Sequence, residues 1–486
     1  MYKSKSILYL RTFSAEELTS FGEFLNSPYF NTNNRVTKLF TELKKHYPEF
    51  MGKGVDKEVI YKKLFPGKPF NEQVLKNINS ELLKLEKLFL SVNSLIKDPF
   101  IKYRGLVNEL INRNIDTLFE KESRAYEEEI RTSDASFDKQ CLNLFNLEEN
   151  RFTNNMINNR QELVTGNIEK SGEYLTIYYL NNILRFYMNN SINKFSFNSV
   201  IDVNFPEIIL NNINMDELIN FMELHNIDFT LNLKLTYYSM LCIKDVNDDE
   251  TYKKFKTLLF SNIDKLNRDE AHANLHFMES ICAQKINSGK AEFYKDLFET
   301  YVHEIDNNIY NPHEHSPLTV MKYRNIYLSA IRVGEFNWAE NFINEFKKKL
   351  QKEDRQNIVS LAMAQLEFEK KEYESTLEYL KKISTDQLFY KVDVKILSLR
   401  SLFELGHYET VISTIESFRR MLNSNTSLTE QYRQKNLNFT GALNVLVKAK
   451  MDNDPEAARK TVEKIKEYDM ITNKNWLLQK AAEIGI

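Results

Sequence analysis

The sequence predicts an all-α protein, in which a small helical N-terminal domain is followed by an α-solenoid. The chain of 486 residues contains only 12 glycines and 9 prolines, fewer than the many tight turns of strand-rich and α/β folds require. Its apolar residues recur at helical rather than strand spacing along most of the chain. The 33 phenylalanines and 25 tyrosines supply large apolar surfaces for burial between helices.

Residues 1–98 are expected to form the helical N-terminal domain. Ser14 and Glu17 match a capping box at the start of the first helix, which is expected to end before Pro28, since proline disfavours helical geometry at the preceding residue. Three further helices are expected at residues 35–47, 56–64 and from 71 onward. The last has one apolar face, formed by Val74, Ile78, Leu82, Leu85 and Phe89. Its opposite face is expected to carry Lys76, Lys84, Glu86 and Lys87.

An alternative interpretation of this domain is a helix-turn-helix that binds nucleic acid. Residues 55–90 resemble the helix-turn-helix segment of winged-helix response-regulator and activator proteins, with an acidic helix start, a short helix, a turn and a recognition helix. The resemblance implies that this recognition helix presents Lys76, Asn77, Asn79 and Lys84 to nucleic acid. Residues 1–100 carry 16 Lys and Arg against 11 Asp and Glu, a net charge of +5, which fits modest nucleic-acid binding. No β-wing pattern follows, so a small helical capping domain is the favoured interpretation.

Residues 99–265 are expected to form a helical middle region. Its apolar spacing predicts one long helix over residues 102–132, which ends at the segment TSDASFD. Further helices are expected at residues 137–164, 168–190 and 215–224. Residues 140–215 are rich in asparagine, but apolar residues are interleaved throughout. We therefore expect packed helices with asparagine on their polar faces rather than a disordered tract.

Residues 266–486 contain a pattern that recurs around successive turns. The turns are expected at Gly334, Lys371, Gly406 and Asn453, at spacings of 37, 35 and 47 residues, and a weaker unit turns at Gly289. The last spacing is lengthened by the insertion LNSNTSLTEQ. Two residues after the first three turns stand Phe336, Tyr373 and Tyr408, and five residues after all four stand Ala339, Thr376, Val411 and Ala458. A near-constant period of this kind indicates stacked helix pairs.

This pattern resembles the tetratricopeptide repeat, a helix-turn-helix unit of about 34 residues. The small residue that the family carries in its first helix is present only as Ala364, and its counterparts are Tyr327, Leu399 and Leu446. The last stretch, NWLLQKAAEIGI, is expected to form a helix that covers the end of the array. The whole chain also resembles a family of uncharacterised bacterial helical proteins through LNSPYFN, LFTELKKHYPEF and LFPGKPFNEQ. That resemblance implies no particular activity.

The sequence shows few patterns that carry chemistry. His272 and His276 stand four residues apart, as metal ligands on a helix can, but Ala273 occupies the position where a metalloprotease needs glutamate. His313 and His315 are expected in a loop. The segment PGKP lacks the spacing of a phosphate-binding loop, and neither a nucleophile elbow nor a dinucleotide fingerprint is present. We therefore expect no enzyme activity, no bound metal and no cofactor.

These features predict a cytoplasmic scaffold or adaptor that binds other proteins through a helical-repeat surface. The three cysteines are widely spaced and odd in number, which favours buried thiols in a reducing compartment. No signal peptide and no membrane-spanning segment is expected. The alternative is a transcriptional regulator that binds DNA through residues 1–98 and senses a partner through the repeats. Nucleic acid is the less favoured partner, because the whole chain has a net charge of −3.

Overall fold

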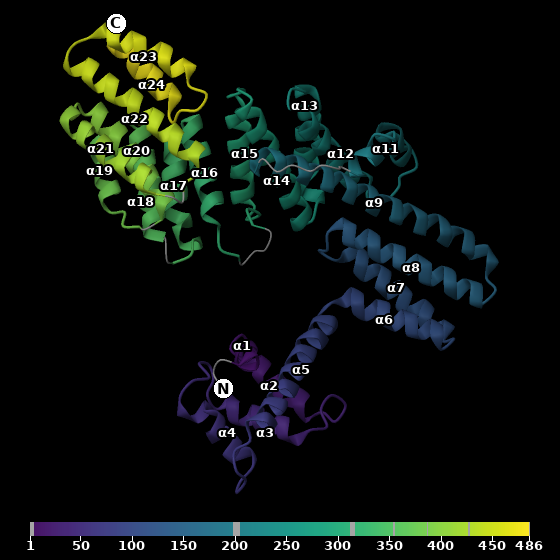
Figure 1. Cartoon of the computed structure of the whole chain (residues 1–486). Helices are drawn as coiled ribbons and strands as arrows, with labels where there is room; N and C mark the ends of the chain where they lie inside the picture. Colours follow the sequence, from purple (N-terminus) through teal and green to yellow (C-terminus); the bar gives the residue numbers. More distant parts are fainter. Residues whose placement is uncertain are drawn as a thin grey trace. The chain divides into compact units, whose positions relative to one another are not determined.

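The computed structural model of this chain is shown in Figure 1, and it describes residues 4–197, 205–311, 316–352, 355–385, 387–425 and 428–485. The described residues form 24 α-helices and three short 3-10 helices, with no β-strand among them. The all-α prediction is confirmed. The chain divides into two compact units, Met1–Leu180 and Asn181–Ile486, which are described separately below. The three-part division at residues 98 and 265 stays a prediction.

The first five helices share one apolar core. They are α1 (Lys5–Leu10), α2 (Ala15–Asn26), α3 (Asn34–Lys44), α4 (Lys57–Leu64) and α5 (Glu72–Lys97), with a 3-10 turn at Lys53–Val55. The predicted capping box is present: the Ser14 hydroxyl accepts from Glu17 N at 3.1 Å, and the Glu17 carboxylate accepts from Ser14 N at 2.9 Å. Phe21 lies at the centre of the core, with its ring 4.9 Å from that of Phe40 and 5.2 Å from that of Phe89.

The two faces of α5 differ from the prediction at two positions. Leu75 is buried in the core, whereas Val74 is only partly buried. Glu86, which was assigned to the exposed face, is completely buried. The Ser6 hydroxyl of α1 donates a hydrogen bond of 2.5 Å to Glu86 Oε1, while Glu86 Oε2 has no hydrogen-bond partner in the described structure. The apolar face of α5 is therefore wider than its sequence indicates, because α1 covers one more row of side chains.

The middle helices correct two predicted boundaries. The structure contains α6 (Pro99–Asn112), α7 (Asp116–Thr132), α8 (Phe137–Ile157) and α9 (Gln161–Phe197). Residues 102–132 are thus two helices and not one, because Asn114 adopts a left-handed φ of 52° that ends α6. Asn159 does the same with a φ of 54°, so α8 ends earlier than predicted.

The asparagine-rich tract is helical where it is described, and its residues 198–204 lie outside the described residues. The tract forms packed helices as predicted, but Asn154, Asn155 and Asn181 are buried and do not lie on an exposed polar face. Asn154 Nδ2 donates to Asp116 Oδ1 at 2.8 Å, and Asn181 Oδ1 accepts from the Thr236 hydroxyl at 2.9 Å. These hydrogen bonds offset the cost of burying the amides.

The second unit continues with a further series of helices. The first are α10 (Phe205–Leu210), α11 (Met215–Leu224), α12 (Thr230–Lys244), α13 (Asp249–Asn262), α14 (Arg268–Asn287) and α15 (Phe293–Asp306), with a 3-10 turn at Ile263–Lys265. They are followed by α16 (Val320–Val333), α17 (Phe336–Phe346), a 3-10 turn at Lys347–Lys349, α18 (Arg355–Glu369), α19 (Tyr373–Lys381), α20 (Leu388–Glu404), α21 (Tyr408–Ser424), α22 (Glu430–Met451), α23 (Pro455–Glu467) and α24 (Lys474–Ile484). Each helix from α14 onward packs against the next, and α16 with α18, α18 with α20 and α22 with α24 also touch. This order of contacts agrees with stacked helix pairs, and α24 packs on α22 and α23 as the predicted terminal helix should.

The predicted turns share one backbone conformation. Gly334, Lys371, Gly406 and Asn453 all have a left-handed φ, of 87°, 69°, 74° and 54°. After each turn, a backbone N–H donates to the carbonyl five residues earlier, as in a Schellman motif. These bonds are Glu335 to Ala330, Glu372 to Glu367, His407 to Leu402 and Asp454 to Ala449, at 2.8–2.9 Å. Gly289 turns in the same way, with a φ of 102°. Residues 426–427 belong to the insertion that lengthens the spacing between the last two turns, and they lie outside the described residues.

Candidate interaction surfaces

The repeat-defining side chains lie between the paired helices. Ala339, Thr376, Val411 and Ala458 are all fully buried. The aromatic residues after the turns are partly buried: Phe336 packs on the core around α16 and α17, the Tyr373 ring lies 5.3 Å from Phe368, and the Tyr408 ring lies 5.7 Å from Phe403. These residues hold the two helices of each pair together. They therefore fix the shape of the repeat surface without being binding residues themselves.

Side chains of alternate helices meet on one side of the second unit, which we call the first-helix face. It is defined by Arg324 on α16, Gln365 on α18 and Asp393 on α20. Arg324 Nη1 donates to Asp393 Oδ2 at 2.8 Å, and the Tyr327 hydroxyl donates to Gln365 Oε1 at 2.6 Å. Burial lowers the pKa of Arg324, but the attraction and hydrogen bond of the Asp393 carboxylate raise it by more, so the net pKa of Arg324 is raised.

The opposite ends of the same helices are closed by the last helix. The Arg400 guanidinium lies 4.1 Å from the Phe368 ring centre and 5.4 Å from that of Trp476. Burial lowers the pKa of Arg400 to about 10. Trp476 Nε1 donates to Glu404 Oε1 at 2.8 Å, and Lys480 Nζ lies 2.9 Å from Glu404 Oε2. These contacts fasten α24 to α20.

Three of the four candidate nucleic-acid contacts of α5 are exposed, and the fourth is partly buried. Lys76, Asn77 and Lys84 are exposed. Lys76 Nζ lies 3.5 Å from Glu72 Oε1, and Asn77 Oδ1 accepts from Gln73 Nε2 at 2.9 Å. Asn79 is partly buried, and its Oδ1 is shielded from solvent.

The predicted histidine and cysteine positions show no assembled metal centre. Within the described ranges no cluster of three or more potential metal ligands is present, and His313 and His315 lie outside those ranges. His272 lies one turn from His276, and burial lowers the pKa of His272 to about 4. Cys141, Cys242 and Cys282 are buried free thiols. Burial raises the pKa of Cys242 and of Cys282 to about 12, which makes both poor nucleophiles.

A buried charged cluster between α14, α15 and α16 carried no signal in the sequence. Lys322 forms ion pairs with both Glu279 and Glu304, and its Nζ lies 2.6 Å from Glu304 Oε2. Glu304 is fully buried, and this burial together with the nearby Glu279 raises its pKa well above the ordinary value. Lys322 of α16 thus links the Glu279 carboxylate of α14 to the Glu304 carboxylate of α15.

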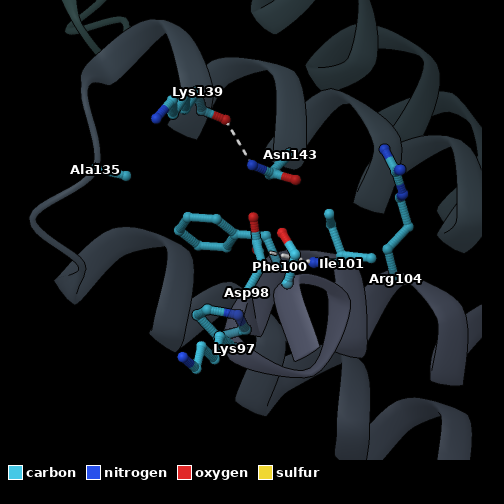
Figure 2. Close-up of a pocket in the computed structure, with 10 residues that line it drawn as sticks. Lys97, Asp98, Phe100, Ile101, Arg104, Ala135, Lys139 and Asn143 are labelled. Atoms are coloured by element: carbon cyan, nitrogen blue, oxygen red, sulfur yellow. Dashed lines mark hydrogen bonds between the residues drawn. The ribbon is translucent and has the colours of Figure 1, made fainter. Parts of the chain in front are cut away.

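A cleft in the first unit, which we call the α5–α8 cleft, is lined by two stretches of the chain, residues 94–104 and 135–143, brought together by folding (Figure 2). It has a volume of 520 Å³. Its lining residues are Ser94, Lys97, Asp98, Pro99, Phe100, Ile101, Arg104, Ala135, Lys139 and Asn143. They come from the end of α5, the first turns of α6, the α7–α8 connection and the start of α8. Sequence analysis did not identify this cleft.

A second groove lies between α13 and α15 and has a volume of 730 Å³. Phe260, Phe298 and Val302 give it an apolar lining. The lysine at its edge, Lys256, is already neutralised, because its Nζ lies 2.8 Å from Asp296 Oδ1 and 2.9 Å from Glu299 Oε2. Its charge is therefore satisfied within the protein.

Neither a membrane-spanning helix among the described residues nor a similar known protein indicates a function for this chain. No helix in the described part of the chain is long and apolar enough to cross a membrane. No protein-family model, no curated protein and no solved structure matches this chain.

Proposed function

We infer that this protein is a non-enzymatic scaffold or adaptor of the cytoplasm that binds other proteins through the first-helix face. The observation that supports this proposal is the partly exposed Arg324–Asp393 ion pair, which joins side chains of α16 and α20 on the second unit. The bond from the buried Tyr327 to Gln365 ties α18 to α16 beneath this pair. A face shared by successive helices is long enough to receive an extended or helical segment of a partner.

The helix pairs are tetratricopeptide-like in this proposal. The shared left-handed turns and the buried residues five positions later support that interpretation. The position seven residues before each turn departs from the family pattern, since Tyr327, Leu399 and Leu446 are large and buried there. The first-helix face therefore takes a shape of its own, and partners of other tetratricopeptide proteins cannot be transferred to it.

The proposal is tested with the full chain by chemical cross-linking and mass spectrometry on complexes isolated from the native host. The test variant combines Arg324→Ala with Asp393→Ala, which removes both charges and keeps the net charge. The control combines Glu374→Ala with Lys381→Ala, two exposed residues of α19. We expect cross-links from α16, α18 and α20 to a partner in the wild type and the control, and their loss in the test variant. Cross-links confined to other helices, or a partner retained by the test variant, would contradict the proposal.

The alternative function is a DNA-binding regulator. The exposed Lys76 and Lys84 on α5, together with the positive charge of residues 1–100, favour it. The ion pair of Lys76 with Glu72 and the partial burial of Asn79 weaken it, because both reduce what α5 can offer to phosphate or bases. Salt-dependent DNA binding by the full chain is the measurement that separates the two functions.

A further inference from the structure

The α5–α8 cleft combines an apolar floor with an open side. In the view of Figure 2 the Phe100 ring lies within the cleft, with Lys139 and Asn143 on one side of it and Lys97 on the other. Phe100 is only partly buried, although a phenylalanine at a helix junction is normally packed. The volume of 520 Å³ lies within the range of ligand-binding pockets.

The charges around this floor are unbalanced. Lys97, Arg104 and Lys139 all line the cleft, and none of them forms an ion pair with a described carboxylate. The one acidic residue of the lining, Asp98, is used within the protein, since its Oδ1 accepts from Ile101 N at 3.1 Å and caps α6. Lys256, in the groove of the second unit, has two carboxylate partners. With three cations and one carboxylate, the lining of the α5–α8 cleft carries a net charge of +2, which an anionic ligand from outside can neutralise.

Exposed apolar side chains also occur where α5 ends and α6 begins. Leu95 is 49% exposed, Ile96 is 64% exposed and Ile101, at the start of α6, is 38% exposed. Of these three, only Ile101 lines the cleft, together with Phe100. A ligand that covered this region would gain from the burial of apolar surface as well as from charge neutralisation.

We propose that the α5–α8 cleft binds an acidic protein segment that inserts an aromatic or aliphatic side chain against Phe100 and Ile101. The carboxylates of the segment pair with Lys97, Arg104 and Lys139. A bare phosphate or a nucleic-acid backbone would satisfy the cations but would leave Phe100 and Ile101 uncovered. This site and the first-helix face are formed by different residues, in different units, so the test of this site is independent of the proposed function.

The test measures binding of a fluorescein-labelled peptide of alternating aspartate and leucine, with one central phenylalanine, to the full chain by fluorescence anisotropy. Two matched peptides replace either all aspartates by asparagine or all apolar residues by serine. The charge variant is Lys97→Glu with Lys139→Glu, and its control is Lys121→Glu with Arg124→Glu on the exposed surface of α7. Ile101→Ser tests the apolar part separately. Hydrogen exchange of α5 to α8 verifies that each variant is folded.

We expect the acidic apolar peptide to bind the wild type and the α7 control equally, and to bind less tightly as salt increases. Binding should weaken by about tenfold or more in the charge variant, and measurably in Ile101→Ser. Both matched peptides should bind more weakly than the test peptide. If the acidic serine peptide or inorganic pyrophosphate binds equally well, the cleft recognises charge alone and the proposal is wrong. Equal binding by the charge variant, or no binding to the wild type, would also overturn it.

Discussion

Replacement of Glu86 by glutamine should remove most of the pH dependence of the N-terminal helical core. Glu86 is completely buried under α1, and the Ser6 hydroxyl donates its only hydrogen bond in the described structure. Burial raises the pKa of Glu86 from its ordinary 4.5 to about 8, while the bond from Ser6 acts in the opposite direction. The protonated carboxyl is therefore the form that the fold accepts.

The sign and size of the effect follow from this pKa. Because the folded state holds the proton more tightly than the unfolded state, the contribution of Glu86 is fully present below pH 4.5 and is lost as pH rises to about 8. Each pH unit in this window costs up to about 1.4 kcal/mol, so the loss at pH 7 is about 3 kcal/mol. Glutamine cannot ionise, but its buried N–H₂ lacks a second partner and costs about 1–3 kcal/mol. The pH slope is therefore a sharper readout than stability at one pH.

The appropriate assay is hydrogen exchange of peptides from α1 and α5 at several pH values, corrected for the intrinsic pH dependence of exchange. Tryptophan fluorescence is unsuitable, because Trp338 and Trp476 both lie in the second unit. Glu58→Gln, at an exposed position of α4, is the control. We expect protection to decrease from pH 5 to pH 8 in the wild type and in the control, and to stay level in Glu86→Gln. An unchanged slope in Glu86→Gln would refute this reasoning.

Three further predictions concern the repeats and α5. Ala339→Phe should overpack the contact between α16 and α17 and cost about 1–3 kcal/mol, with faster hydrogen exchange in that pair and its neighbours; unchanged exchange would mean that the repeat register is wrong. Lys371→Gly should stabilise its turn by about 1 kcal/mol, since glycine adopts a left-handed φ without a Cβ penalty, and Gly406→Ala should destabilise its turn by a similar amount. Urea unfolding of the second unit measures both free energies, and a less stable Lys371→Gly variant or a more stable Gly406→Ala variant would contradict the turn geometry. If α5 binds DNA, Lys76→Glu with Lys84→Glu should weaken that binding and reduce its salt dependence; filter binding at several salt concentrations checks this, and unchanged binding would remove α5 from consideration.

Local signals in the sequence predicted the elements that local contacts determine. Ser14 and Glu17 stand three residues apart, and the capping box they form needs nothing from the rest of the chain. The left-handed turn at Gly406 is similarly local. Asn114 was missed because asparagine is compatible with a helix interior as well as with a left-handed turn. Composition alone therefore does not distinguish one helix over residues 102–132 from two.

The position of Glu86 depended on a contact that its helix does not reveal. Its partner Ser6 is 80 residues away in sequence, and α1 was not among the predicted helices. The α5–α8 cleft was missed for a related reason. A single helix over residues 102–132 would carry the chain away from Phe100, whereas the turn at Asn114 returns it, so that Lys139 lines the same cleft as Phe100.

The chain-order contacts of the second unit bear on how the protein is made. Because α14 to α24 each pack against the next helix along the chain, most of the native contacts of a pair join residues that are close in sequence. Chains with such low contact order fold rapidly, since little loop entropy is lost before contacts form. A pair such as α16–α17 can therefore form as soon as it leaves the ribosome and can serve as the surface on which α18 assembles during synthesis. Helix α24 then packs on α22 and α23, and the bond from its Trp476 to Glu404 can form only once α20 is in place.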